Sequence, residues 1–438
     1  MTGIDASATY VLAEPIEKAR SIHYGCDAAA RVAACFSVPT PLRAHDFPER
    51  GNINQHTFLI VAGARGARRE YLLQRLNHDV FTRPHHVMAA MMACIRAQRE
   101  YLARNPLPPG DEWDVITLVP TRDGEDYLEL FDEQGTTVWR LMERIPEART
   151  CKSLGEVASH DERLRLAEEA GRGLAMYGDF TSGMDAASLS SALPGYRDTR
   201  LYYDQFASVL RGSRTAEDAD LFLPADEILR DSTWRHFLVH LPPEEYHRRL
   251  ADPDLQPFIA LAKRQRDFGM TLLSAMESGA IRTVAIHGDT KLDNFLFSTR
   301  TGRAKALVDL DTIMPHTWLV DWGDMVRSLV NVAGEKESDP ERVRVDMDVF
   351  RAIARGFLST AREVTRGEVA LMVDAVQIIA LELGVRFLTD YLRGDTYFRV
   401  GHGDSPTINK TRAMVQLTLF TRLQDAGREM RETIAALA

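Results

Sequence analysis

The chain has 438 residues, of which 45% are hydrophobic and 26% are charged, a balance that is ordinary for a water-soluble globular protein. This length exceeds what one simple core accommodates, so two lobes or domains are expected. The formal net charge of −10 argues against a nucleic-acid-binding protein, because such proteins usually present a basic face.

The cysteines and the apolar segments indicate the compartment. Free thiols in a reducing compartment are expected, since no CxxC or Cys/His ligand pattern occurs at Cys26, Cys35, Cys94 and Cys151. The N-terminal MTGIDASATYVLAEP lacks the basic start and apolar run of a signal peptide, and the most apolar window, VMAAMMACI, is too short to span a bilayer. A cytoplasmic protein that has neither a membrane nor a nucleic acid as partner is the expectation.

The first third of the chain is predicted to be rich in strands. Residues 1–25 are expected to form an N-terminal extension, and residues 26–145 a β-rich N-lobe. HTFLIVAG and REYLLQRL flank ARGAR as a hairpin would, and WDVITLVP, DYLELFD and TTVWRLMERI predict further strands between Asp/Gly turns. One helical segment, PHHVMAAMMACIRAQREYL, interrupts them.

After this region the periodicity becomes helical, which predicts a mainly helical C-lobe over residues 146–438. The segment LPPEEYHRRLADPD is expected to be a loop-rich connector. A β-hairpin at 284–310 is expected within the helices, and the fold class is therefore α+β. The segments with helical periodicity are DERLRLAEEAGRGLAMYGDF, PFIALAKRQRDFGMTLLSAMESG, RVDMDVFRAIARGFLSTA, RGEVALMVDAVQIIALELGVRFLTDYL and the last thirty residues.

The hairpin carries the most informative residues, in IHGDTKLDNFLF (286–297) and ALVDLDT (306–312). If the hairpin is symmetric about residues 301 and 302, Asn294 lies opposite Asp309, and their oxygens form a ligand set for Mg²⁺. Asp289 would project from the same loop and could accept or orient a hydroxyl proton. Asp and Asn are also common in turns, but the combined spacing is hard to explain by turn chemistry alone.

The spacing His-x-Asp-x-x-x-x-Asn matches the kinase catalytic loop. His287 to Asn294 resembles the loop of the aminoglycoside phosphotransferase and choline kinase superfamily, and VDLDT resembles its metal-binding segment. HGDTKLDNFLF, TGRAKALVDLDTIMP, DWGDMVRSLVN and GVRFLTDYLRGDTYF resemble the N-acetylhexosamine 1-kinase branch of this superfamily. The resemblance runs with gaps from about residue 25 to 430. It implies a bilobal protein-kinase-like fold.

The resemblance implies a role for each polar residue of the hairpin. Asp289 is the catalytic base or hydroxyl-orienting group, and Asn294 and Asp309 are Mg²⁺ ligands that bridge to the phosphates of ATP. Lys291 could reach the transferring phosphoryl group, although a solvated lysine would look the same.

Three neighbours are expected to support this loop rather than to react. His287 is expected to pack and to hold the loop by hydrogen bonds. Asp321 and Asp324 are expected to cap the next helix and to tie the hairpin down, since Asp is favoured at helix starts.

In the N-lobe, ERGNINQHTFLIV resembles the glycine-containing β1–β2 turn of the superfamily. The resemblance implies that Gly51 lets the backbone approach the phosphates of the nucleotide and that Asn52 offers a polar group to the substrate, but an ordinary hairpin turn has the same pattern. Gln74 stands where the superfamily often places a phosphate-contacting Lys or Arg, and the following helix lacks the glutamate that pairs with it. The hexosamine 1-kinase branch also carries glutamine at this place.

The lobe connection is expected after VWRLMERI. Backbone groups near Met142, Glu143 and Ile145 would then meet the adenine edge of the nucleotide, as the linker does in this fold. The alternative for this segment is a core strand, and Trp139 and Leu141 are expected to be core residues.

For the acceptor, GVRFLTDYLRGDTYF is the best candidate segment. Arg386 and Tyr397 are expected to line the sugar site together with Asp289, since charged groups and an aromatic wall suit a sugar. The alternative is an i,i+4 salt bridge between Arg386 and Asp390 on one helical face.

The leading hypothesis is a kinase that uses Mg²⁺ and ATP to phosphorylate a small sugar, most simply at the anomeric 1-OH of an N-acetylhexosamine or a related amino sugar. The enzyme alternative is a kinase of another small alcohol, such as an aminoglycoside or a choline-like acceptor. The other class of alternative is a catalytically silent, nucleotide-binding pseudokinase. A monomer or a homodimer is expected.

Overall fold

The computed structural model describes residues 10–11, 25–47, 53–54, 56–132, 135–398, 400–401 and 403–438. The chain divides into two compact units. The β-rich unit comprises the described residues of Met1–Arg96 and Asp114–Ala148, and the helical unit comprises those of Ala97–Trp113 and Arg149–Ala438.

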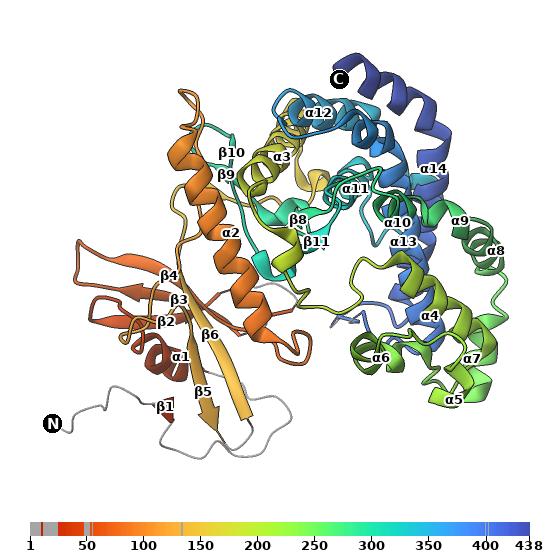
Figure 1. Ribbon diagram of the computed structural model, residues 1–438, viewed down its shortest axis with the longest axis horizontal. Helices are drawn as coiled ribbons and strands as arrows, with labels where there is room; N and C mark the ends of the chain where they lie inside the picture. The colour runs from red at the N-terminus through yellow and green to blue at the C-terminus, as the bar shows by residue number, and fades with distance from the viewer. Residues whose placement is uncertain are drawn as a thin grey trace. The chain divides into compact units, whose positions relative to one another are not determined.

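A six-stranded sheet forms the β-rich unit, in the order β1-β5-β6-β4-β3-β2 (Figure 1). Neighbouring strands are antiparallel except for β1, which is parallel to β5. The strands are β1 (Tyr10–Val11), β2 (Leu42–Asp46), β3 (Thr57–Ala62), β4 (Arg69–Arg75), β5 (Leu128–Asp132) and β6 (Gly135–Glu143).

The hairpin predicted around ARGAR is confirmed as β3 and β4, in which Ile60 pairs with Tyr71. Alternate residues of these strands face a core that includes Phe58, Leu73 and Trp139, each 2% exposed or less. Burial of these apolar side chains supplies the main driving force for the sheet. The same core receives one face of α1 (Cys26–Ala33).

The strand predicted for WDVITLVP is wrong. Residues 113–120 form no strand, and they meet β6 through an isolated bridge between Leu118 and Met142 and through hydrogen bonds from Val119 N to Leu141 O and from Glu143 N to Thr117 O. The apolar alternation of this segment reflects burial against β6 rather than a continuous ladder. The helix predicted next to it is confirmed as α2 (Pro84–Arg104).

The helical unit consists mainly of long helices, and the predicted helical periodicity is confirmed for the longest of them. Its long helices are α3 (His160–Thr181), α4 (Thr199–Arg211), α11 (Leu319–Val330), α12 (Met347–Leu358), α13 (Arg366–Arg393) and α14 (Ile408–Leu437). Shorter helices are α5 (Ala216–Ala219), α6 (Glu227–Thr233), α7 (Pro243–Leu250), α8 (Gln256–Arg264), α9 (Arg266–Gly269) and α10 (Thr271–Glu277). The fold class, α+β, is therefore confirmed.

Helix α13 forms the centre of this unit, packed between α11 and α14, while α3 packs against α12 (Figure 1). It begins with a capping box, in which the side chains of Thr365 and Glu368 each bond to the backbone of the other. The α3–α12 contact is close because glycines lie in it: a Cβ at Gly356 would stand 2.0 Å from Glu168 O. Among the described residues, no helix combines the length and the apolarity needed to cross a membrane.

Two expectations for the helical unit need correction. The connector LPPEEYHRRLADPD contains α7, which has proline in its first turn, a position that tolerates proline because its N–H has no partner in the helix. The segment predicted as one helix at 257–279 is three short ones, α8, α9 and α10.

Four short strands hold the loop at 287–294 in place. The strands β8 (Val284–Ile286) and β11 (Met314–His316) pair antiparallel, as do β9 (Phe295–Ser298) and β10 (Ala304–Leu307). The predicted hairpin is therefore β9–β10 alone, since β8 pairs outside it. A further two-residue strand is β7 (Ala148–Arg149).

The symmetric register predicted for the hairpin is wrong by one residue. Leu307 pairs with Phe295, and the pairing shifts at a bulge between Ala304 and Ala306. In consequence the N–H of Val308 donates to Asn294 O at 2.9 Å. Asp309 follows that pair directly instead of facing Asn294.

Candidate active site

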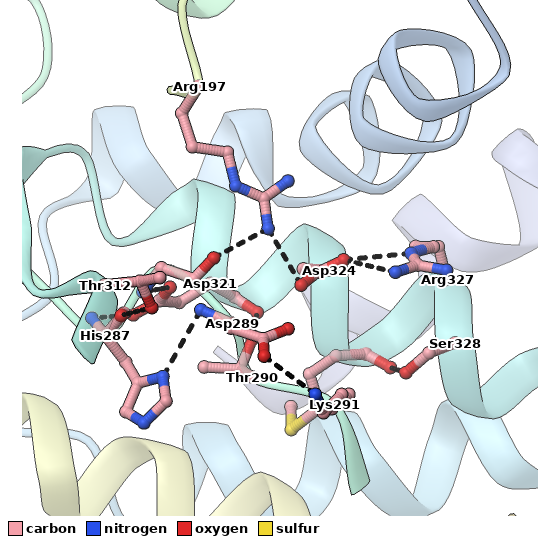
Figure 2. A network of polar contacts seen from close by, with 12 residues as sticks. Arg197, His287, Asp289, Thr290, Lys291, Thr312, Asp321, Asp324, Arg327 and Ser328 are labelled. Carbon is pink, nitrogen blue, oxygen red and sulfur yellow. Dashed lines mark hydrogen bonds and ion pairs between the residues drawn. The ribbon is translucent and has the colours of Figure 1, made fainter. Parts of the chain in front are cut away.

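The loop that carries Asp289 is fixed through the two residues before it. The backbone N–H groups of His287 and Gly288 both donate to the carboxylate of Asp321, at 2.7 and 2.8 Å (Figure 2). Gly288 has φ of +86°, and a Cβ there would stand 2.6 Å from Thr312 O, so only glycine fits. The expectation that Asp321 ties the loop down is confirmed, whereas its predicted role as a helix cap is wrong, because α11 begins after Trp318.

Burial raises the pKa of Asp321 to about 7, while its two N–H donors and Arg197 act in the lowering direction. Both donors favour the carboxylate form that they bind. The carboxylate therefore acts as a backbone clamp in the interior of the helical unit, where it is 3% exposed.

The carbonyl of Gly288 is held by two residues that the sequence analysis missed. Arg197 Nη2 and Tyr196 Oη donate to Gly288 O at 2.8 and 3.0 Å. Both residues lie in LPGYRDTR, a segment without helical periodicity. The one sequence signal was a Gly-Tyr-Arg stretch just before Asp198, which is a helix-capping residue in the structure.

Arg197 also joins the loop to two buried acids. Its Nη2 lies 2.8 Å from Asp324 Oδ2 (Figure 2), and its Nη1 lies 3.6 Å from Glu382 Oε1. Asp324 is bonded in addition by Arg327, at 2.6 Å. Burial acts to raise the pKa of Asp324, but the two guanidinium groups outweigh it and hold this pKa well below its ordinary value. Asp324 is thus an ion-pair partner of Arg197, and its predicted role as a helix cap is wrong.

His287 is fully buried and holds the loop, as expected. Its Nε2 lies 2.9 Å from Val308 O, and its Nδ1 accepts the N–H of Asp289 at 3.3 Å. This pattern fixes the neutral imidazole with its proton on Nε2. Burial lowers the pKa of His287, which is consistent with that neutral form.

Asp289, Lys291 and Asn294 are brought together by this loop. Lys291 Nζ lies 3.0 Å from Asp289 Oδ2 (Figure 2), and the amide of Asn294 donates to Asp289 O at 2.7 Å and to Oδ2 at 3.2 Å. Burial opposes the charge of Lys291, but Asp289, Asp293 and Asp309 outweigh it and raise the pKa of this lysine. Lys291 is therefore held as a cation among acids, and it is not a lysine exposed to solvent alone.

Asn294 and Asp309 present oxygen atoms of the kind that Mg²⁺ prefers. The side-chain nitrogen of Asn294 donates to Asp289. The side-chain oxygen of Asn294 accepts no hydrogen bond within the described chain, so it is available to a ligand. Asp309 has the left-handed φ of +66°, a conformation uncommon for aspartate. Within the described chain, no group of three or more His, Cys, Asp or Glu is placed to hold a metal.

Arg386 lies inside an aromatic box made by Tyr196, Tyr202, Tyr397 and Phe398. Its guanidinium carbon is 5.3, 4.5, 5.5 and 5.3 Å from the respective ring centroids, which are cation–π distances. Its Nη2 also lies 3.2 Å from Tyr397 Oη. Burial acts against the charge of Arg386, but the three tyrosines outweigh it and raise the pKa of the guanidinium.

The salt bridge considered between Arg386 and Asp390 does not form. The buried Asp390 pairs instead with Arg393 at 2.9 Å. Its carboxylate also accepts the backbone N–H groups of Thr396, Tyr397 and Phe398 at 2.8 to 3.1 Å. Asp390 therefore folds the chain after α13 back onto the helix, which carries two rings of the box to Arg386.

In the β-rich unit, Gln74 is bonded to Arg140 of the neighbouring strand. Its Oε1 accepts Arg140 Nε at 3.0 Å and a second guanidinium nitrogen, and Gln74 and Arg140 are paired in the sheet register. Arg140 is 1% exposed and also contacts Met91 of α2. A cationic side chain therefore does lie beside Gln74, on β6 instead of β4.

The residues proposed for adenine lie at the end of β6. Trp139 and Leu141 are fully buried, so their prediction as core residues is confirmed. Met142 pairs with Leu72 in the sheet, and the N–H of Glu143 already donates to Thr117 O at 2.9 Å. Ile145 follows the strand.

Gly51 and Asn52, which were proposed for phosphate and substrate, lie outside the described residues.

A sheet-containing unit, a mainly helical unit and a clamped His-x-Asp loop define a protein-kinase-like protein. The family model described as "Phosphotransferase enzyme family" (APH) matches residues 47–347, more than half of the chain. The chain belongs to this phosphotransferase enzyme family.

Three solved structures are similar to this chain at low sequence identity. A microcompartment-associated aminopropanol kinase is 16% identical with a TM-score of 0.52, and the match covers 92% of this chain and 98% of that one. A choline kinase from Cryptosporidium parvum is 12% identical with a TM-score of 0.43, covering 88% and 91%. An ethanolamine kinase from Plasmodium vivax is 10% identical with a TM-score of 0.41, covering 86% and 81%.

Proposed function

We propose that this protein is an ATP- and Mg²⁺-dependent small-molecule kinase that phosphorylates a sugar, at the anomeric 1-OH of an N-acetylhexosamine or a related amino sugar. Membership of the phosphotransferase enzyme family supports the reaction class. The resemblance of the segments around His287 and Arg386 to N-acetylhexosamine 1-kinases supports the acceptor. The β-rich N-lobe, residues 26–145, would contact the nucleotide, and residues 146–438 would hold the acceptor and the metal.

The observation that carries the choice of acceptor is the aromatic box around Arg386. A choline-like or amine acceptor needs an aromatic cage that receives its cation. Here the described cage is filled by the guanidinium of the protein itself, which repels a second cation. A neutral, hydroxyl-rich acceptor avoids this repulsion and can accept hydrogen bonds from Arg386. This argues for a sugar over choline, ethanolamine or an aminoglycoside.

The Arg386 box and the Asp289 loop are joined by Tyr196. Its hydroxyl donates to the carbonyl of Gly288, the residue before Asp289, and its ring faces the guanidinium of Arg386. An acceptor bound beside Arg386 and Tyr397 would therefore lie near the carboxylate of Asp289. We assign Arg386 and Tyr397 to the acceptor on this basis, together with Asn52 from the resemblance.

In the proposed reaction, Asp289 orients the acceptor hydroxyl and takes its proton late in the transfer. The acceptor oxygen forms a bond to the γ-phosphorus of ATP as the bond from that phosphorus to the bridging oxygen breaks, and ADP leaves. An anomeric hydroxyl is more acidic than other sugar hydroxyls, so a carboxylate suffices as base. Lys291 lies 3.0 Å from Asp289 and would offset negative charge on the transferring group.

Asn294 and Asp309 are proposed to hold Mg²⁺, which when bound neutralises phosphate charge. For the nucleotide we retain Gly51, Gln74, Met142, Glu143 and Ile145 as proposed contacts. Of these, Glu143 could contribute its carbonyl only, since its N–H is bonded to Thr117.

The test is release of ADP from ATP and Mg²⁺ across N-acetylglucosamine, N-acetylgalactosamine, glucosamine, galactose, choline, ethanolamine and an aminoglycoside. We expect sugar-dependent ADP release, with the N-acetylated sugars preferred and a 1-phosphate identified by NMR of the product. Release that rises with choline or ethanolamine and with no sugar would overturn the choice of acceptor. Nucleotide binding without turnover of any acceptor would favour the pseudokinase.

A further inference from the structure

A cavity of about 500 Å³ lies in the β-rich unit and shares no residue with the site described above. Its lining comes from the chain that follows β4, from the start of α2 and from the second residue of β6. The lining residues are His78, Thr82, Arg83, Pro84, His85, His86 and Thr136.

The described lining residues are rich in hydrogen-bond donors, and none of them is a carboxylate. One arginine, three histidines and two threonines can all donate to a ligand. The cavity also meets the first turn of α2, a helix of 21 residues whose first turn carries no acidic side chain. The positive end of the helix therefore adds to the charge of Arg83.

Two of the histidines are already engaged. His78 Nε2 accepts the N–H of Val138 at 3.3 Å, and burial lowers the pKa of this ring, so it is a neutral donor through Nδ1. His85 Nδ1 lies 3.3 Å from Tyr127 Oη and 3.4 Å from Glu129 Oε1. The carboxylate of Glu129 therefore already supplies negative charge next to His85.

Arg83 and His86 are the other two basic residues of the lining. In the part of the chain that the structure describes, Arg83 forms no ion pair. His86 Nδ1 is buried and has no hydrogen-bond partner there. Arg83 therefore brings a guanidinium that has no carboxylate partner in the described chain to a cavity whose other described polar residues can donate hydrogen bonds, and a bound anion would supply the missing negative charge.

We propose that this cavity binds a small phosphate-bearing anion, held by Arg83 and His86 and by the hydroxyls of Thr82 and Thr136. The planar guanidinium matches two phosphate oxygens at once, and the remaining oxygens can accept from the ring and hydroxyl donors. The volume suits a phosphate monoester of a small molecule, since ligand cavities of roughly 300–1,000 Å³ are usual. The site does not depend on the proposed sugar-kinase reaction.

The experiment is isothermal titration of the full chain, free of nucleotide and Mg²⁺, with inorganic phosphate and with glycerol 3-phosphate. Arg83→Gln and His86→Gln are the test variants. Arg68→Gln, which alters an exposed arginine of the β3–β4 turn in the same unit, is the matched control. Arg386→Gln distinguishes this cavity from the aromatic box.

We expect phosphate to bind the unaltered chain, and Arg83→Gln to weaken this binding roughly tenfold, because it removes the charged hydrogen bonds to the anion. His86→Gln should weaken binding less, and Arg68→Gln and Arg386→Gln should leave it unchanged. Loss of binding only in Arg386→Gln would move the anion to the aromatic box and overturn the proposal. Equal affinity in Arg83→Gln and the unaltered chain, or no binding to the unaltered chain, would overturn it as well.

Discussion

Arg197 donates a hydrogen bond of 2.8 Å to the carbonyl oxygen of Gly288, a residue 91 positions away in the sequence and directly before Asp289. The N–H of the same residue donates to the carboxylate of Asp321. The backbone before the proposed base is thus held from both sides by buried charged groups, which restricts the directions that the Asp289 side chain can take.

Replacing Asp289 by asparagine should abolish most turnover. The amide keeps the shape of the side chain but cannot take the proton of the acceptor, so we expect kcat to fall by roughly 10²–10⁴ with little change in thermal stability. Steady-state ADP release measures this. Asp374→Asn, at the surface of α13, serves as the control with kcat within twofold of the unaltered enzyme. Full activity of Asp289→Asn would remove Asp289 from its assigned role.

Replacing Arg197 should disturb both stability and turnover. Arg197→Met leaves the buried carboxylates of Asp324 and Glu382 without this partner, so we expect a loss of about 3–5 kcal/mol in the free energy of unfolding. Arg197→Lys keeps the charge but cannot span both contacts, and it should lower kcat more than it raises KM. Urea denaturation and steady-state kinetics measure these effects in both Arg197 variants. Arg200→Lys is the control, because Arg200 is exposed and is paired with Glu277. Unchanged stability of Arg197→Met would contradict the buried network.

Replacing Arg386 should change the choice of acceptor. In Arg386→Met the aromatic box loses its internal cation, so KM for the sugar should rise roughly tenfold or more while KM for ATP stays the same. The emptied box should also gain weak affinity for choline, visible as a shift in intrinsic tyrosine fluorescence. Arg393→Met, which removes the neighbouring guanidinium paired with Asp390, distinguishes loss of the fold from loss of acceptor contacts. A sugar KM that does not move in Arg386→Met would argue against acceptor binding at the box.

Gln74→Lys should be harmful, although lysine is the common superfamily residue at this place. The new ammonium group would lie against Arg140, which is 1% exposed, and two like charges there repel each other strongly. We expect a lower melting temperature than for Gln74→Met, which loses only the hydrogen bonds and should cost about 1–3 kcal/mol. Scanning calorimetry of both variants tests this. A Gln74→Lys variant as stable as the unaltered protein would contradict the contact with Arg140.

The buried His316 should make the protein less stable in acid. Burial, aided by Arg197, lowers the pKa of His316 to about 4 from its ordinary 6.5. Between these pH values the unfolded chain binds the proton that the folded chain does not, so stability rises with pH and is lost as the pH falls from 6.5 to 4. The free energy of unfolding, measured by urea denaturation over this pH range, should fall less in His316→Gln than in the unaltered protein. The difference at pH 4 should be roughly 1–3 kcal/mol.

The comparison with His316→Gln is needed because Asp321 acts in the opposite direction. Its pKa is raised, so its contribution to stability is lost as the pH rises from about 4 to about 7. If the free energy of unfolding varied with pH in the same way in both proteins, the prediction would be wrong, because His316 would then have the same pKa in the folded and unfolded states.

Features set by local sequence were predictable. The periodicity of α13 and the turn between β3 and β4 are encoded in adjacent residues, and both were predicted correctly. The sequence also predicted that Asp289, Lys291 and Asn294 lie together in one loop, and the structure confirms that proximity. The exact register of β9 and β10 was not predicted, because a bulge near Ala304 shifts it and no residue type demanded that bulge.

Features set by contacts between distant segments were not predictable. Nothing near Tyr196 or Arg197 in the sequence indicates that they bond to Gly288, since only the packing of the helical unit brings them there. Arg386 and Asp390 were correctly placed one helical turn apart. The carboxylate of Asp390 nevertheless binds the backbone N–H groups of residues 396–398 instead of the guanidinium of Arg386. A buried carboxylate can satisfy more lone pairs with such a loop than with one neighbouring guanidinium.

The fold of residues 394–398 over Asp390 has a consequence for how specificity can diverge. The backbone that carries both of its rings is held by one carboxylate, that of Asp390, and among the described residues no hydrogen bond or ion pair joins this segment to the Asp289 loop. A short exchange of sequence between Gly394 and Phe398 could therefore re-shape acceptor recognition and leave the phosphoryl-transfer residues as they are. Relatives with other acceptors could arise by changes in this one segment, provided that Asp390 is kept.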